Sequence, residues 1–392
     1  MTDTIYLDHA ATTPLDPDVG RVMFPHALQT WGNPSSIYQA GQDARAVLDD
    51  ARRTVAAVLG ASPSEIVFTG GATESDNLTL SGVAWAARLG NPDGSWPHIV
   101  TSAIEHSAVL ETAEWLQRIG FEVTYVPCDA RGLVDPESIR PAVRPETCLI
   151  SVMFANNEVG AVQPIAEIGR IARATAVPLH IDATQAPGLL PLDMDDLGVD
   201  LMTLSAHKFY GPKGVGLLYV RTGTSIAWQQ HGGGQESGRR GGTENVAGIV
   251  GLAAALDRAE TYRPEYARHC RELRDQLRAG LAGAIDDIQV NGPSTDERRL
   301  PSILNVTFRG VQGETLLLNL DMQGVAASAG SACTTGNSEP SHVLLAMGLT
   351  DEAARSTVRF SVGRSNTPEQ IDEVVDIVAE SVARIRSLAR TR

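Results

Sequence analysis

A lysine that directly follows an apolar stretch is the residue of this sequence with the clearest chemical use. In the segment DLMTLSAHKFYGPKG, the apolar run leads into Ser205, His207 and Lys208, and glycine and proline follow. A lysine desolvated at the end of a strand has a lowered pKa and can form a Schiff base with a carbonyl carbon. Most lysines lie at the surface instead, and Lys213 fits that alternative better than Lys208 does.

Other polar groups also follow apolar, strand-like stretches. Asp182 ends VPLHID, where its carboxylate could pair with a protonated ring nitrogen or cap a helix, and Gln185 could donate to a phenolate oxygen. His106 ends HIVTSAIEH and could stack on a ring and carry protons, although a lone histidine is more often structural. Three polar residues that could orient a substrate or a ring follow SVMFA, namely Asn156, Asn157 and Glu158.

Two glycine-rich segments could bind an anion. In EIVFTGGATESDNL a strand-like stretch leads through a Gly-Gly-Ala turn into a helix-like one, and backbone N–H groups there, with the Thr73 hydroxyl, suit a phosphate. A plain tight turn explains this pattern equally well. The segment QHGGGQESGRRGGTENVAG, which contains Thr243, is either a flexible surface loop or a second anion-binding element that reaches a partner subunit.

A cysteine and an arginine near the C-terminal end add two further functions. Cys333 lies in ASAGSACTTGNSEPS, whose small polar residues predict a mobile, exposed loop over about 326–340, so a reactive thiol is favoured over a core residue. Arg359 lies in the alternating pattern of STVRFSVG, and arginine is well suited to bind an α-carboxylate through two hydrogen bonds.

Together these groups match the requirements of pyridoxal 5′-phosphate (PLP). The cofactor needs a lysine for its aldehyde, an acid for its ring nitrogen, donors for its oxygen and phosphate, and a partner for its ring. The sequence therefore predicts a PLP enzyme that acts on a small amino acid, with the Schiff base on Lys208.

The elements that must position these groups alternate along the chain. Seven strand candidates lie between residues 65 and 220, with helix-like segments such as 43–60 and 107–120 among them. This alternation predicts an α/β fold with a mainly parallel seven-stranded sheet and helices on both faces. After about residue 262 a charged helical stretch precedes further strands, which predicts a smaller α/β domain. We expect a large domain over 16–262, and a small domain made of 1–15 and 263–392 that carries the cysteine loop.

Composition excludes several classes of protein. The net charge of −15 disfavours direct binding of nucleic acid. The chain has no apolar run long enough for a membrane span and no secretory signal, so we expect a cytoplasmic protein. The four cysteines, Cys128, Cys148, Cys270 and Cys333, have neither disulfide-framework nor zinc-site spacing.

The chain resembles the cysteine desulfurases, a group of PLP enzymes of aminotransferase fold type I. The matching motifs run from residue 6 to about 364, and SAHKFYGPKG together with GSACT is specific to this group. The resemblance implies the conversion of L-cysteine to L-alanine with a persulfide on Cys333, which supplies iron–sulfur cluster assembly or other sulfur pathways. It also implies a homodimer, a sulfur-acceptor or scaffold protein as partner, and a transient iron–sulfur cluster that Cys333 could bind through its persulfide.

The resemblance assigns roles by motif position. Lys208, Cys333 and His106 would be catalytic. The residues that would hold PLP are Ala72 (through its backbone), Thr73, His106, Asn157, Asp182, Gln185, Ser205, His207 and Lys208, with Thr243 reaching the phosphate of the neighbouring subunit. The substrate would be bound by Asn33, Asn157 and Arg359.

Two positions depart from the pattern of the group. Ser237 stands where arginine is usual, and Tyr38 stands where histidine is usual. Three rival functions remain: another PLP enzyme such as a selenocysteine lyase or a small aminotransferase, a sulfur-relay or scaffold protein without catalysis, and a cysteine hydrolase with His342 as base.

Overall fold

A seven-stranded sheet forms the centre of the computed structural model, which describes residues 4–329 and 339–390. The strand order is β2-β8-β7-β6-β5-β3-β4. The bounds are β2 Ile66–Thr69, β3 His98–Ser102, β4 Glu122–Val126, β5 Thr147–Ser151, β6 Leu179–Asp182, β7 Leu201–Ser205 and β8 Gly216–Val220. Only β8 is antiparallel to its neighbours β2 and β7. The predicted mainly parallel sheet is thus confirmed, and its strands come from the seven predicted stretches.

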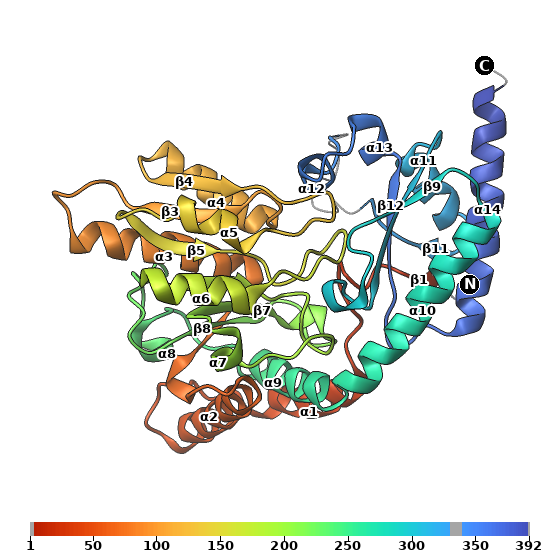
Figure 1. The fold of residues 1–392 in the computed structure, drawn as a ribbon. Coiled ribbons are helices and arrows are strands. Elements are labelled where there is room, and N and C mark those ends of the chain that lie inside the picture. Colours follow the sequence, from red (N-terminus) through yellow and green to blue (C-terminus); the bar gives the residue numbers. More distant parts are fainter. Residues whose placement is uncertain (1–3, 330–338, 391–392) are drawn as a thin grey trace.

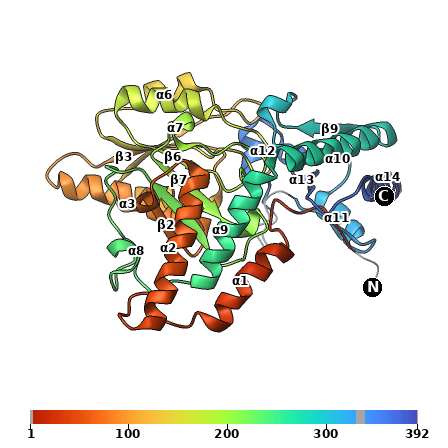
Figure 2. The same ribbon diagram turned by 90° about the horizontal axis from the view of Figure 1, so that it is seen from below.

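Helices cover both faces of this sheet (Figures 1 and 2). One face packs against α3 (Ala72–Gly90) and α4 (Ser107–Arg118). The other face packs against α2 (Gln39–Leu59), α6 (Ile165–Thr175) and α9 (Val246–Thr261), with α1 (Pro17–Gln29) beside α9. Strands β7 and β8 in the sheet are buried along their whole length, as expected for mostly apolar strands covered on both faces, whereas the edge strand β4 is partly exposed.

A second hydrophobic core lies beside the first. Its sheet has the antiparallel order β12-β10-β9, with β9 Ile288–Asn291, β10 Ile303–Phe308 and β12 Thr357–Ser361. It packs against α10 (Arg263–Ala284), α11 (Gly313–Asp321) and α14 (Pro368–Arg390). From these two cores we propose the domain division given above, at residues 16 and 262.

Short elements complete the chain. They are β1 Ile5–Tyr6, α5 Pro136–Ile139, α7 Met194–Leu197, α8 Gln235–Gly238, β11 Val325–Ala326, α12 His342–Ala346 and α13 Asp351–Arg355. The N-terminal strand β1 pairs in parallel with β11, so the start of the chain belongs to the second core.

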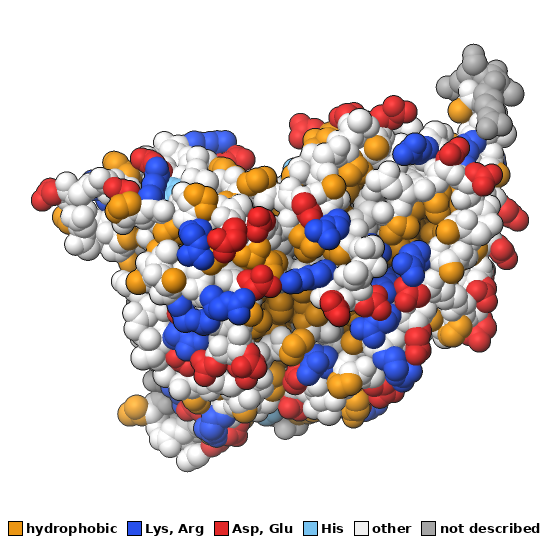
Figure 3. Space-filling model, in the orientation of Figure 1, with side chains coloured by type: hydrophobic (Ala, Val, Ile, Leu, Met, Phe, Trp, Pro, Cys, Tyr) orange, Lys and Arg blue, Asp and Glu red, His pale blue; other side chains and the backbone are white. Residues whose placement is uncertain are grey.

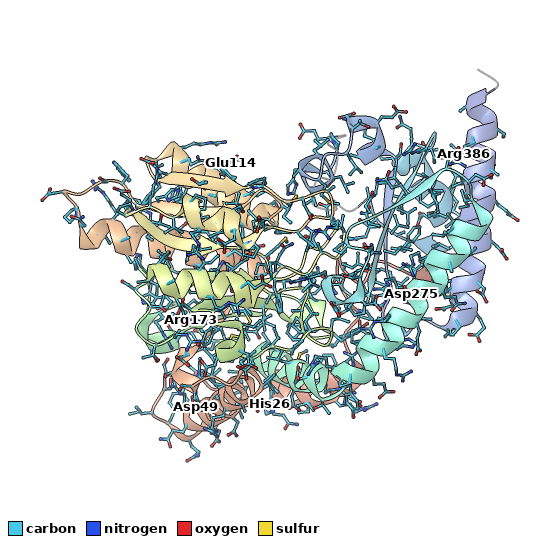
Figure 4. All side chains as sticks on the ribbon, viewed as in Figure 1. His26, Asp49, Glu114, Arg173, Asp275 and Arg386 are labelled. Atoms are coloured by element: carbon cyan, nitrogen blue, oxygen red, sulfur yellow. The ribbon has the colours of Figure 1, made fainter. Side chains whose placement is uncertain are left out.

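The surface carries many charged side chains, with apolar ones among them. Acidic and basic side chains alternate over the face seen in Figure 3, without a large area of one sign. Charged residues such as Asp49 of α2 and Glu114 of α4 lie on the outer sides of their helices (Figure 4). Within the described ranges, no helix combines the length and the apolar character needed to cross a membrane.

Candidate active site

A cavity of about 790 Å³ opens at the carboxyl ends of β6 and β7. This volume lies in the range of small-molecule and cofactor sites. Most of the predicted PLP and substrate residues line it: Ala72, Thr73, His106, Asn157, Asp182, Gln185, Ser205, His207, Lys208 and Arg359. The chain thus brings together residues that are up to 287 positions apart in sequence, from Ala72 to Arg359.

Lys208 ends a single 3-10 turn, Ala206–Lys208, that follows β7. Its Nζ donates hydrogen bonds to the carbonyl oxygens of Ala10 (2.6 Å) and Ala11 (2.8 Å). The amine is therefore fixed at the wall of the cavity by the N-terminal segment. Sequence reasoning did not foresee this contact, because no local pattern links residues 10–11 to residue 208.

Asp182 is the last residue of β6 and is buried. One of its carboxylate oxygens accepts from the Thr184 backbone N–H at 2.9 Å. The Thr184 hydroxyl is buried, lines the same cavity and has no hydrogen-bond partner among the described residues. A polar ligand in the cavity would satisfy this hydroxyl, which sequence reasoning missed.

Behind Asp182 lies a group of buried titratable side chains. Burial raises the pKa of Glu105 to about 8, and burial followed by the charge of Asp182 raises the pKa of Asp76 well above its ordinary value. Burial lowers the pKa of His180 to about 3, and its Nε2 lies 3.7 Å from an Asp76 carboxylate oxygen. Glu105 and His180 are therefore mainly neutral at pH 7, and the raised pKa of Asp76 favours its neutral form as well.

The residues of the predicted phosphate cradle surround the beginning of α3. Gly70 and Gly71 line the cavity beside Ala72 and Thr73, and a Cβ at Gly216 would lie 2.7 Å from the Gly71 Cα atom. This close approach of two backbones requires glycine. The exposed N–H groups of a helix of 19 residues favour an anion at this point.

Two histidines have defined contacts in the cavity. His106 precedes α4 and its Nδ1 accepts from the Ala108 backbone N–H at 3.1 Å, so Nε2 carries the proton of the neutral ring. The Nδ1 of His207 lies 3.0 Å from the Thr12 hydroxyl. Burial, with the charges of Lys208 and Lys213, lowers the pKa of His207 to about 4, which leaves it neutral at pH 7.

Arg359 enters the cavity from β12 of the second core. Its Nη2 forms an ion pair with an Asp8 carboxylate oxygen at 2.6 Å, and its Nη1 donates to the Asn157 carbonyl oxygen at 2.9 Å. Gln185 was expected to contact a ring oxygen. In the structure its Nε2 donates to the Ala10 carbonyl oxygen at 3.0 Å.

Two predicted residues do not line the cavity, and a third lies outside the described residues. Asn33 and Thr243 are not among the residues that line the cavity, and Thr243 is exposed in this single chain. Cys333 lies outside the described residues, as does most of the predicted loop 326–340. In the described part of the chain, no cluster of three or more His, Cys, Asp or Glu side chains could hold a metal ion.

The residues present fit PLP. The cavity offers a lysine amine, a buried carboxylate, a helix N-terminus with two glycines, and an unpartnered hydroxyl. These are the groups that an aldehyde, a ring nitrogen and a phosphate need.

Comparisons with known proteins agree with this assignment. The model of the family "Aminotransferase class-V" matches residues 5–374. The cysteine desulfurase IscS of Dictyoglomus turgidum is 43% identical, over 99% of this chain and 97% of the relative. That of Methanosarcina thermophila is 47% identical, over 98% of this chain and 93% of the relative. A solved structure described as a NifS-like protein has a TM-score of 0.89 and 39% identity, and covers 97% of this chain and 99% of its own.

Proposed function

Because the chain belongs to the class-V aminotransferase family, we propose that it is a PLP-dependent cysteine desulfurase. The observation that carries the proposal is the convergence of Lys208, Asp182 and Arg359 on one cavity. These side chains supply an amine for an aldehyde, an acid for a ring nitrogen and a guanidinium for an amino acid carboxylate. Full-length relatives with the same printed activity support it.

The reaction converts L-cysteine and an enzyme thiol into L-alanine and a persulfide. The bond between the substrate Cβ and sulfur breaks with its electron pair left on the carbon skeleton, a sulfur–sulfur bond forms on Cys333, and one proton takes the place of sulfur on Cβ. When bound, PLP withdraws electron density from the substrate Cα and so makes cleavage of its bonds feasible.

The chain's own residues bind the substrate and the cofactor and move the protons. The guanidinium of Arg359 binds the substrate carboxylate, with Asn157 beside it. The carboxylate of Asp182 holds the positive charge of the ring nitrogen. The Nζ of Lys208 and the Nε2 of His106 are the two atoms at which a proton can be held and passed on.

The cofactor phosphate would be held by backbone, hydroxyl and imidazole donors at the beginning of α3 and just after β7. These are Ala72, Thr73, Ser205 and His207. Thr243, which does not line the cavity of its own chain, reaches the phosphate of a second copy in a homodimer. Asn33 assists in substrate binding.

The finer assignments go beyond the reaction itself. Cys333 accepts the sulfur and passes it to a scaffold or other acceptor protein, and through its persulfide it can bind a transient iron–sulfur cluster. The IscS name of the relatives supports iron–sulfur cluster assembly as the destination of the sulfur, and we place this activity in the cytoplasm.

The test is the formation of alanine and sulfide from L-cysteine in the presence of a reductant. We expect a yellow protein that forms both products, a Lys208→Ala variant without visible absorbance or activity, and a Cys333→Ala variant that binds PLP but releases no sulfide. Cys128→Ala is the matched control, because this half-buried thiol lies outside the cavity and burial raises its pKa to about 11. Full sulfide release by Cys333→Ala would contradict the proposed role of that thiol.

A further inference from the structure

The chain contains only two lysines, and both line the same cavity. Lys208 and Lys213 are the only lysines among its 32 basic residues, and the others are arginines. At an exposed position that serves only solubility, this chain uses arginine. Lysine carries a compact ammonium charge at the end of a flexible alkyl chain, whereas arginine carries a planar guanidinium group. The presence of lysine rather than arginine at position 213 therefore indicates a specific contact for its ammonium group.

Lys213 lies beside the predicted phosphate cradle. It belongs to the loop between the turn that holds Lys208 and strand β8, and it is exposed. Strand β8 begins at Gly216, the residue that packs against the Gly71 backbone. The charge of Lys213 also contributes to the lowered pKa of His207, so its ammonium acts electrostatically on a residue of the cradle.

The other cations that line the cavity are already committed. Arg359 forms an ion pair with Asp8 at 2.6 Å. The amine of Lys208 becomes part of the Schiff base when PLP is held. His207, with its pKa lowered to about 4, is neutral at pH 7.

A phosphate monoester has a second pKa of about 6 and carries close to two negative charges at pH 7. The other donors of the cradle are backbone N–H groups, hydroxyls and the neutral imidazole of His207, which carry no full charge. Glu74, an acid that lines the cavity, is paired with Arg240 at 2.9 Å. Among the described residues, Lys213 forms no ion pair with any acid, so its charge is available to an anion.

We propose that Lys213 binds the phosphate group of the cofactor from the exposed rim of the cradle and supplies positive charge that the cradle otherwise lacks. The inference deepens the proposed function, because it rests on PLP as the ligand of this cavity. It predicts that Lys213 contributes to the preference for PLP over pyridoxal, which has the same ring and aldehyde but no phosphate.

The experiment titrates the cofactor-free full-length chain with PLP and, separately, with pyridoxal. Binding is followed by the visible absorbance of the bound ligand, and the wild type is compared with Lys213→Met and Lys213→Arg. For Lys213→Met we expect PLP affinity to fall by about threefold to tenfold, the size of a partly solvated charge interaction, with unchanged pyridoxal affinity. We expect Lys213→Arg to retain most of the PLP affinity. Added salt should reduce the difference in PLP affinity between the wild type and Lys213→Met.

Arg118→Met is the matched control for net charge, because Arg118 is an exposed residue of α4 that does not line the cavity. The proposal is overturned if Lys213→Met binds PLP as the wild type does, or if it loses PLP and pyridoxal affinity equally. An equal loss of PLP affinity in Arg118→Met would overturn it too. The titration uses no L-cysteine, so a chain that shows the Lys213 effect yet releases no sulfide would refute the proposed function alone.

Discussion

Replacing Arg359 with lysine tests how the substrate is recognised. Arg359 is 1% exposed, and its guanidinium serves Asp8 and the Asn157 carbonyl oxygen while it lines the cavity. A planar group with five N–H donors can keep both contacts and still bind a carboxylate. The single ammonium of a lysine keeps the charge but loses this geometry.

The size of the effect follows from the hydrogen bonds that are lost. A hydrogen bond to a charged group contributes about 1.5–3 kcal/mol, and about 1.4 kcal/mol corresponds to a factor of ten. We therefore expect Arg359→Lys to lower kcat/KM for L-cysteine by about 10-fold to 100-fold. The loss should fall mainly on KM, because the carboxylate is bound equally in the ground state and the transition state.

The assay measures initial rates of alanine formation against L-cysteine concentration, with visible absorbance as the check on cofactor loading. Arg364→Lys is the matched control, since Arg364 is an ion-paired arginine that does not line the cavity. The reasoning is refuted if Arg359→Lys leaves KM within about twofold of the wild type, or if Arg364→Lys raises KM to the same extent.

Two further predictions concern stability. Glu236 is buried, binds Arg52 through two hydrogen bonds (2.7 and 2.9 Å) and accepts from the Phe68 backbone N–H, so Glu236→Ala should cost about 3–5 kcal/mol and lower Tm. The double variant of Arg52→Ala and Glu236→Ala leaves neither charge buried without its partner, so its loss of unfolding free energy should be smaller than the sum of the two single losses. A loss equal to that sum would contradict this explanation. The pKa of Glu105 is raised from 4.5 to about 8 in the folded chain. Between these two pH values the folded chain keeps the Glu105 proton that the unfolded chain has lost. The free energy of unfolding therefore falls as pH rises from about 4.5 to about 8. The difference in Tm between Glu105→Gln and the wild type should therefore increase in favour of the variant from pH 5 to pH 8. A difference in Tm that does not change with pH would exclude a raised pKa of Glu105.

The sequence predicted the parts of the site that follow from local pattern. Lys208, Asp182 and Ser205 each lie at or just after the end of an apolar strand, and parallel strands bring such ends to one edge of a sheet. The fold class was predictable for the same reason. The roles of all these site residues stay predictions; of the predicted set, Asn33 and Thr243 do not line the cavity and Cys333 lies outside the described residues.

Contacts over long sequence separations could not be predicted. No pattern in the first residues indicates that Asp8 pairs with Arg359 or that the Ala10 and Ala11 carbonyl groups accept from Lys208. Asp76 was also missed, because a polar residue within a helical stretch usually faces solvent, whereas here it faces the sheet and is fully buried. Strand β9 was missed because its four residues, IQVN, alternate between apolar and polar but form too short a stretch to stand out from the surrounding sequence.

The position of the N-terminal segment has a consequence for how the protein folds during its synthesis. Asp8 and Ala10 contact Arg359 and Ser361, which lie 351 residues later in the chain. During synthesis, when domains form in order from the N-terminus, the first residues made are therefore among the last to find their places. The wall that holds the Lys208 amine is complete only after Ser361 has left the ribosome. Cofactor loading in its final geometry must then be a post-translational event, and a fusion that restrains residues 5–12 would impair it without touching any residue of the large sheet.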